Sequence, residues 1–332
     1  MRQPREPGEN ANVAIAMTHP GEESTPNHPL AARMGVIAFF CHNMIIGCLM
    51  GSFSVMLASV ESRMGVSREM SSSVGSFVIF GSALMGSFAG PLIARHSLRL
   101  LMLAGALISV AGYLILAFTA DYNVYRGVYL LLFGPAMALA GSVGPATLVT
   151  RWFSRGRGLA LGLVHLSLVV AIMPLLCNWI LEHHGAPAVY QTMALLIAIT
   201  LVPACLLARD YPPGAEASAV AAAHPEASDK GDSLTVAQIL RSPAFRMLAI
   251  GAGLVITEIM MLTFNMIPFA ESLGIDRDHG AILQAVMSFS GMAGSIIFGW
   301  IADRIGGARG MALLAFNVAV LLGILVLFEL PF

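Results

Sequence analysis

Long apolar segments limit the folds open to this chain more than any other feature. A helix needs about 20 apolar residues to cross a hydrocarbon core about 30 Å thick. Nine segments reach that length, approximately 34–60, 72–94, 98–119, 127–150, 158–181, 188–208, 244–270, 281–302 and 311–329. Each is expected to be helical, because lipid offers no partner to an open backbone N–H or C=O group. The segments are too long and too continuously apolar for the strands of a membrane barrel.

Composition agrees with a lipid-exposed surface. Hydrophobic residues make up 57% of the chain and charged residues 11%, whereas soluble domains carry roughly 25% charged residues. The formal net charge of −1 argues against nucleic acid as a partner. We therefore predict an all-α membrane protein whose main partner is the lipid bilayer.

The basic residues divide unequally between the two sides of the predicted bundle. With the N-terminus placed in the cytoplasm, only Arg63, Arg68, Arg126 and Arg277 of the 18 Lys and Arg residues fall outside. Loops rich in Lys and Arg stay on the cytoplasmic side. The pattern predicts a multi-pass protein of the cell (inner) membrane with a cytoplasmic N-terminus.

Polar segments divide the chain into parts. Residues 1–33 lack the apolar core of a signal peptide and are expected to form a disordered cytoplasmic tail. Residues 34–208 are predicted to form a six-helix bundle, and 244–332 a three-helix group. Between them, 209–243 reads as a flexible cytoplasmic linker, with a short amphipathic helix that begins near Ser233.

Two loops resemble each other. Residues 90–99 read GPLIARHSLR, and residues 299–309 read GWIADRIGGAR. Both resemble the signature loop of the major facilitator superfamily, GxLaDRxGxR, which follows the second and eighth helices of that family. The second copy matches well, whereas the first has Ala94 in place of the acid and Ser97 in place of the second glycine.

The resemblance implies a conformational switch at these loops. An acid that pairs with an arginine of a neighbouring helix holds two helical groups in one of two states. This role is implied for Asp303 with Arg304, and Ala94 cannot perform it in the first copy. The alternative is that Arg95 and Arg99 only anchor the cytoplasmic side. The implied switch residues in the two loops are Gly90, Arg95, Arg99, Gly299, Asp303, Arg304, Gly306 and Arg309.

A narrower resemblance concerns residues 151–163, which read RWFSRGRGLALGL. This stretch is similar to the entry into the fifth helix of monocarboxylate porters and oxalate–formate antiporter relatives. It adds Arg151, Arg155 and Arg157 to the implied switch. The later glycines of that pattern are replaced by VHLSLVV at 164–170, so helix packing is expected to differ there.

The family resemblance also implies the architecture and the activity. It implies a bundle of twelve helices in two groups that rock around a central site. Nine of those twelve are predicted here, so the chain is expected to be C-terminally incomplete. The implied function is secondary transport of a small organic anion, proton-coupled or by exchange. The alternatives are a drug or sugar carrier of the same fold, or a non-transporting remnant or receptor.

Ionisable and amide side chains inside the apolar segments are candidates for the central site, because such groups are costly in lipid. Glu258 lies 12 residues beyond Arg246, about 18 Å along the helix, and is predicted to accept a proton near the bilayer midplane. The family resemblance implies that the first and seventh spans both line the cavity, which makes His42 and Glu258 a candidate proton pair across it. The alternative is that these groups are merely buried and hydrogen-bonded. The candidate substrate- or proton-binding residues are His42, Asn43, His165, Glu258 and Asn265.

The remaining chemistry-bearing residues show no recognisable pattern. The four cysteines lie in apolar runs without metal-ligand spacing and are interpreted as core residues. The sequence contains no GxxxxGK[ST] loop and no evident nucleophile–base pair. We therefore predict neither an enzyme nor a cofactor, and the expected ligands are a small-molecule solute and protons.

Overall fold

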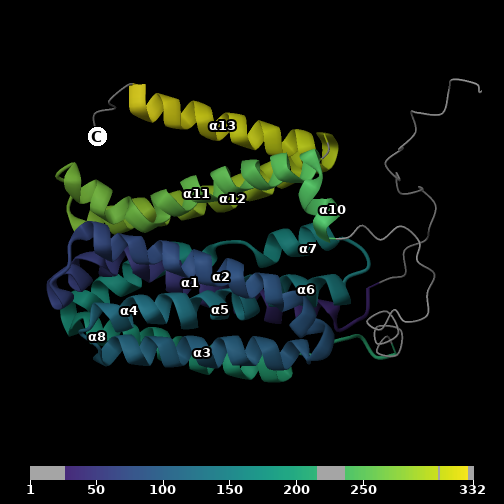
Figure 1. Cartoon of the computed structure of the whole chain (residues 1–332), viewed down its shortest axis with the longest axis horizontal. Coiled ribbons are helices and arrows are strands. Elements are labelled where there is room, and N and C mark those ends of the chain that lie inside the picture. Colours follow the sequence, from purple (N-terminus) through teal and green to yellow (C-terminus); the bar gives the residue numbers. More distant parts are fainter. Residues whose placement is uncertain (1–26, 215–235, 306, 328–332) are drawn as a thin grey trace, which may run out of the picture.

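The computed structural model describes residues 27–214, 236–305 and 307–327. Every regular element within these ranges is a helix, and seven helices are long and apolar enough to cross a membrane. The predicted all-helical membrane fold is therefore confirmed (Figure 1). The predicted count of nine spans is not confirmed. The 51 residues Arg157–Leu207 form one apolar stretch, and Arg309–Leu321 is a shorter apolar helix.

The first three helices follow the predicted segments closely. They are α1 (Ala31–Met64), α2 (Arg68–Arg95) and α3 (Leu98–Phe118). Gly65 ends α1 with a left-handed backbone, at φ 65°, which glycine adopts without steric cost. Ser67 begins α2, because its side chain accepts a hydrogen bond from the Met70 N–H. Tight turns of this kind set neighbouring helices antiparallel.

The fourth span alternates between α-helical and π-helical turns. It consists of α4 (Tyr122–Val128), η1 (Tyr129–Phe133), α5 (Gly134–Ala136), η2 (Met137–Ser142) and α6 (Val143–Trp152). π-Helical turns leave some carbonyls without the regular helical donor, and they are frequent at functional sites. The fourth span is thus irregular along much of its length.

The stretch from 157 to 207 is interrupted twice. Residues 165–167 separate α7 (Arg157–Val164) from α8 (Leu168–Leu207). Within α8, Gly185 has φ 78° and ψ 174° and divides the helix into two segments. A straight helix over all 51 residues from 157 to 207 would measure about 77 Å, far more than the thickness of a bilayer. The break at Gly185 falls between the predicted fifth span, which was expected to end at 181, and the predicted sixth span, which was expected to begin at 188.

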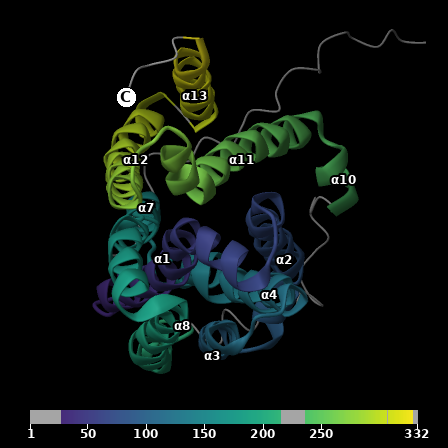
Figure 2. The ribbon, with the colours of Figure 1, turned by 90° about the vertical axis from the view of Figure 1, so that its left-hand side faces the viewer.

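The second helical group begins after the undescribed residues 215–235. It contains α10 (Val236–Arg241), α11 (Pro243–Ser272), α12 (Arg277–Ile305) and α13 (Gly307–Leu327). α10 lies within the predicted amphipathic helix, whereas its predicted start at Ser233 lies outside the described residues. Most of the predicted N-terminal tail and linker also lies outside them. α11, α12 and α13 run along one side of the first group (Figures 1 and 2).

α1 lies at the centre of the core and packs closely on α8. A Cβ atom on Gly47 would lie well inside 3.0 Å of Val169 Cγ1, and one on Gly51 would lie 2.5 Å from Met173 Cβ. Small residues let membrane helices approach in this way. The close approach brings the middle of α1 against the break between α7 and α8.

Candidate functional site

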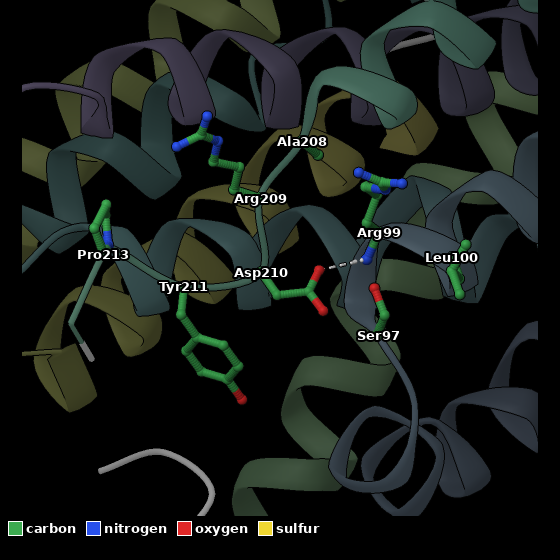
Figure 3. Close-up of a pocket in the computed structure, with 8 residues that line it drawn as sticks. All are labelled: Ser97, Arg99, Leu100, Ala208, Arg209, Asp210, Tyr211 and Pro213. Atoms are coloured by element: carbon green, nitrogen blue, oxygen red, sulfur yellow. Dashed lines mark hydrogen bonds between the residues drawn. The ribbon is translucent and has the colours of Figure 1, made fainter. Parts of the chain in front are cut away.

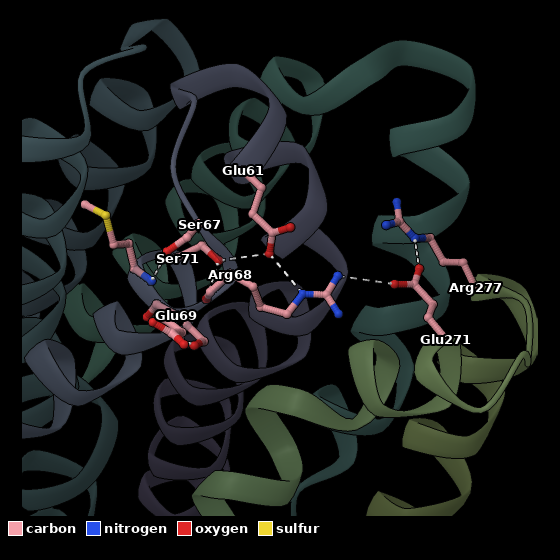
Figure 4. A network of polar contacts seen from close by, with 9 residues as sticks. Glu61, Ser67, Arg68, Glu69, Ser71, Glu271 and Arg277 are labelled. Carbon is pink, nitrogen blue, oxygen red and sulfur yellow. Dashed lines mark hydrogen bonds and ion pairs between the residues drawn. The ribbon is translucent and has the colours of Figure 1, made fainter.

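Charged residues join the two helical groups at one end of the bundle, which we call the ion-pair end (Figure 4). Glu271 of α11 pairs with Arg68 of α2 at 3.9 Å and with Arg277 of α12 at 3.2 Å. Arg68 also pairs with Glu61 of α1 at 3.3 Å, and Ser71 donates a hydrogen bond to the same carboxylate. Four helices from both groups therefore meet in one charge network.

Further contacts close the same end. Asn178 of α8 donates hydrogen bonds to Asp278 of α12 (2.5 Å) and to Glu182 (3.0 Å). The N–H of Ile267 on α11 donates to Ser54 Oγ on α1 at 3.2 Å. The Asn178–Asp278 and Ile267–Ser54 bonds connect the two groups beside the charge network. The structure is thus closed at the ion-pair end.

The turn between α11 and α12 carries its own cap. Asp276 Oδ1 accepts the backbone N–H of His279 at 2.9 Å, and the His279 ring lies 2.8 Å from the same carboxylate. The backbone hydrogen bond, and after it the ring, lowers the pKa of the Asp276 carboxyl. Asp276 therefore holds the first turn of α12 as an ionised cap.

The opposite end carries most of the predicted switch arginines, and we call it the arginine-rich end. Arg151 of α6 lies over the ring of Tyr211, 4.2 Å from its centroid. Arg157 Nε donates to the Phe153 carbonyl. The backbone of Arg155 is held by Asn27, whose Oδ1 accepts its N–H at 2.9 Å and whose Nδ2 donates to its carbonyl at 2.9 Å.

The structure describes the first signature loop completely and the second only in part. Arg95 and Arg99 are exposed, and a Cβ on Gly90 would meet open space. Arg304 and Arg309 are exposed on α12 and α13. Gly306 and the side chain of Asp303 lie outside the described residues, and Gly299 is placed only as part of α12. The predicted Asp303–Arg304 switch therefore stays a prediction.

A carboxylate from elsewhere in the chain reaches the first signature loop, where Ala94 replaces the acid. Asp210, just beyond α8, accepts the backbone N–H groups of Leu98 at 3.0 Å and of Arg99 at 2.9 Å. It thereby caps the N-terminus of α3, as an acid near the first turn of a helix does. Trp152 Nε1 fixes the same segment by donating to the Arg209 carbonyl at 2.8 Å.

In the bundle interior, His42 of α1 bonds to the irregular fourth span. Its Nδ1 lies 2.5 Å from the Gly141 carbonyl oxygen. That carbonyl lacks its ordinary α-helical donor, because the residue four positions on is Pro145, which has no N–H. A carbonyl only accepts, so Nδ1 carries the hydrogen and Nε2 is the free basic nitrogen of His42.

His165 lies beside His42, at the break between α7 and α8. The two ring centroids are 4.4 Å apart. His165 Nδ1 lies 2.8 Å from the Leu161 carbonyl oxygen, so it too carries the hydrogen and leaves Nε2 free. His42 is buried, with 8% of its surface exposed, whereas His165 is exposed. The structure therefore pairs His42 with His165.

Asn43 holds the broken helix together. In a continuous helix the Val164 carbonyl would accept from residue 168, and the Val169 N–H would donate to residue 165. Here Asn43 Nδ2 donates to the Val164 carbonyl at 3.3 Å, and its Oδ1 accepts the Val169 N–H at 3.3 Å. A single buried amide on α1 thus satisfies one backbone group on each side of the break.

Glu258 and Asn265 lie apart from this cluster, on α11. Glu258 Oε2 is buried and has no hydrogen-bond partner among the described residues. Asn265 Nδ2 donates to the Met261 carbonyl of its own helix at 2.9 Å. Asn265 also lines a cavity of about 700 Å³ between α2 and α11. The predicted His42–Glu258 contact is not present in this conformation.

No group of three or more His, Cys, Asp or Glu side chains in the described part of the chain is arranged to hold a metal ion. The four cysteines are buried and free. Sequence reasoning missed the charge network at the ion-pair end, the Asn43 bridge and the Asp210 cap. Of the interior contacts, only the His42–Gly141 bond had a readable signal, which is the proline four residues after Gly141.

Comparison with known proteins assigns the family. The model of the Major Facilitator Superfamily matches residues 36–332. The chain is 21% identical to an uncharacterized MFS-type transporter, YcxA, of Bacillus subtilis (strain 168), over 81% of this chain and 65% of that protein. It is 27% identical to the agnestins efflux protein AgnL12 of Paecilomyces divaricatus, over 76% and 54%. It is 27% identical to Monocarboxylate transporter 13 of Bos taurus, over 76% and 55%.

The chain thus spans between about half and two thirds of the length of these three relatives. The family model nevertheless covers nearly all of the chain outside the N-terminal segment. This match agrees with the all-helical fold and the seven membrane-spanning candidates. The protein belongs to the Major Facilitator Superfamily.

Proposed function

We propose that the protein is a secondary transporter that moves a small organic anion together with a proton, or in exchange, by alternating access. The moving bodies are the group from α1 to α8 and the group from α11 to α13. Membership of a transporter superfamily supports this assignment. The closed ion-pair end supports it as well, because rigid groups joined at one end are one state of such a cycle.

The observation that carries the proposal is the His42–Asn43–His165 cluster, in which His42 and Asn43 are buried and His165 is exposed at the break between α7 and α8. Both imidazoles use Nδ1 to bond a backbone carbonyl, so protons are exchanged at the two Nε2 atoms. Two imidazolium rings with centroids 4.4 Å apart would repel each other. A bound carboxylate offsets that repulsion, so binding of an anion favours uptake of a proton at the pair.

Glu258 is proposed as a second proton carrier. Its Oε2 is buried without a hydrogen-bond partner, and a carboxylate in such a place is costly unless it is protonated or gains a partner. It lies seven residues before Asn265, so the two residues share one face of α11. Rotation of the α11 group during the cycle would give this carboxyl a new environment.

The substrate class rests on two sources. The segment 151–163 resembles monocarboxylate porters, and Monocarboxylate transporter 13 is among the relatives. A second candidate function is efflux of a larger, more apolar compound. The cavity between α2 and α11 favours it, because Phe80, Met260, Met261 and Phe264 line that cavity. The efflux protein among the relatives agrees with this alternative.

The membrane orientation is also a proposal. Lys and Arg residues accumulate on cytoplasmic loops, so we propose that the arginine-rich end faces the cytoplasm of a cell whose inner membrane holds the protein. The ion-pair end would then face outward and form the external gate, with residues 209–243 as a cytoplasmic linker.

Uptake by proteoliposomes tests the proposal. The full-length chain is reconstituted, and entry of labelled lactate, pyruvate, oxalate and formate is measured with and without an inward proton gradient. We expect uptake that the gradient accelerates and a protonophore abolishes. His42→Gln and His165→Gln should remove the gradient dependence, whereas His183→Gln, a matched change at an exposed histidine outside the cluster, should not.

The outcomes separate the parts of the proposal. Uptake of an apolar drug without uptake of any carboxylate would overturn the substrate class in favour of efflux. Carboxylate uptake that keeps its gradient dependence in both histidine variants would overturn the role of the pair. No transport of either class by well-folded protein would favour a non-transporting receptor or remnant.

A further inference from the structure

A second cavity, with a more polar lining, lies at the arginine-rich end (Figure 3). It has a volume of about 480 Å³ and lies between the start of α3 and the segment that follows α8. The lining residues that matter for its chemistry are Ser97, Arg99, Leu100, Arg209, Asp210 and Tyr211. Two arginines, one aspartate and one tyrosine thus line a single cavity.

The carboxylate in this cavity does not neutralise the arginines. Asp210 uses one oxygen for the Leu98 N–H and the other for the Arg99 N–H. No ion pair joins it to the side chain of Arg99 or Arg209 in the described part of the chain. Figure 3 shows both guanidinium groups directed away from the Asp210 carboxylate. The two positive charges are therefore available to an external anion.

The cavity wall is held in place by the surrounding side chains. Trp152 Nε1 donates to the Arg209 carbonyl at 2.8 Å, and Arg151 lies over the ring of Tyr211 at 4.2 Å. The N–H of Arg209 donates to Met34 Sδ at 3.4 Å. The backbone that presents Arg209 and Tyr211 is thus tied to α1 and α6, which makes the cavity a preformed pocket.

The position of the cavity indicates which anion it meets. Both helices that border it end there, at the boundary between the apolar span and the polar loops. Leu100, Leu206 and Leu207 on the same helix ends are exposed by 54%, 50% and 55%. Exposed leucines on the helix ends next to the two arginines offer an apolar surface beside a polar cavity, as a phospholipid requires.

We propose that this pocket, defined by Arg99, Arg209 and Tyr211, binds the phosphate headgroup of an anionic phospholipid whose acyl chains lie along the exposed leucines. Guanidinium groups bind phosphate oxygens in a two-pronged geometry that lysine cannot match. The leucines favour a lipid over free phosphate, because only a lipid has acyl chains that contact their apolar side chains. The site does not depend on which solute the protein carries.

Lipid binding to the purified full-length chain tests the proposal. Dissociation constants are measured by native mass spectrometry for phosphatidylglycerol and phosphatidylcholine of equal chain length. One basic residue near an anionic lipid surface strengthens binding of that lipid by roughly fivefold in the dissociation constant. We therefore expect R99Q/R209Q to weaken phosphatidylglycerol binding about 30-fold and to leave phosphatidylcholine binding unchanged. Arg33→Gln, which removes an exposed charge from the same end outside the pocket, should change neither constant.

Three results would overturn the proposal. One is equal affinity of the wild-type chain for the two lipids, and another is unchanged phosphatidylglycerol affinity in the double variant. The third is competition by inorganic phosphate as strong as that by phosphatidylglycerol, which would make the pocket a free-phosphate site. Single variants R99Q and R209Q, with helix content checked by circular dichroism, guard against misfolding of the double variant. Each should lose about fivefold.

Discussion

Replacement of Asn43 by leucine keeps the volume of the side chain and removes both hydrogen bonds that bridge the helix break. The Val164 carbonyl and the Val169 N–H are then left buried without partners. Each unsatisfied group costs about 1–3 kcal/mol, so the free energy of unfolding should fall by about 2–6 kcal/mol. At about 2–4 °C per kcal/mol, the melting temperature should fall by roughly 4–24 °C.

Thermal unfolding in detergent, followed by tryptophan fluorescence, measures this loss. Asn265→Leu is the matched control, because among the described residues the Asn265 side chain bonds to the Met261 carbonyl of its own helix and to no other helix. It should shift the melting temperature by less than about 2 °C, since Asn265 is only half-buried and a change that breaks no contact between helices costs within about 0.5 kcal/mol. Asn43→Asp should destabilise at neutral pH and recover in acid, where the protonated carboxyl again donates to Val164. An Asn43→Leu protein that melts like the control would refute the reasoning.

Three further predictions follow from packing, charge and capping. Gly47→Ala should destabilise the protein by about 1–3 kcal/mol in thermal unfolding, because the added Cβ meets Val169. The control is Gly86→Ala, whose Cβ meets nothing within 4 Å and which should be neutral or stabilising. Equal effects of the two changes would contradict the close packing of α1 on α8. Glu271→Gln removes two partly exposed ion pairs worth about 0.2–1 kcal/mol each. Only the pair with Arg68 joins the two groups, so the alkylation rate of a cysteine placed in the ion-pair interface should rise by up to about fivefold. An unchanged or lower rate would count against a gate. Asp210→Ala should cost about 0.5–2 kcal/mol of stability by uncapping α3, and an unchanged melting temperature would exclude that cap.

The helices were predictable because lipid imposes a length and an apolar surface on each span. The first segment was expected at 34–60 and is helical over Ala31–Met64, and the second was expected at 72–94 and is helical over Arg68–Arg95. The fifth and sixth segments were expected at 158–181 and 188–208, and the one non-helical residue inside α8, Gly185, lies between them. The count of nine spans is not confirmed, because Arg157–Leu207 forms one apolar stretch and Arg309–Leu321 is a shorter apolar helix.

The contacts between helices were not predictable in the same way. A helix that is apolar on every side does not reveal how it is rotated about its axis, so the sequence did not indicate which residue His42 would meet. Glu258 was one candidate partner, and His165 is the neighbour in the structure. The break at residues 165–167 contains neither glycine nor proline. It is stabilised by Asn43 from another helix, which no local pattern could indicate.

Cross-linking at the ion-pair end tests alternating access most directly. The side-chain atoms of Arg68 and Glu271 lie 3.9 Å apart across the two groups, and the native cysteines are buried. Cysteines at both positions are joined by a short, reducible cross-linker in proteoliposomes, and uptake of a labelled carboxylate is measured before and after reduction. We predict that the cross-link stops uptake and that reduction restores it, because this end must open in each cycle. Uptake at the unmodified rate through cross-linked protein would contradict the proposed mechanism.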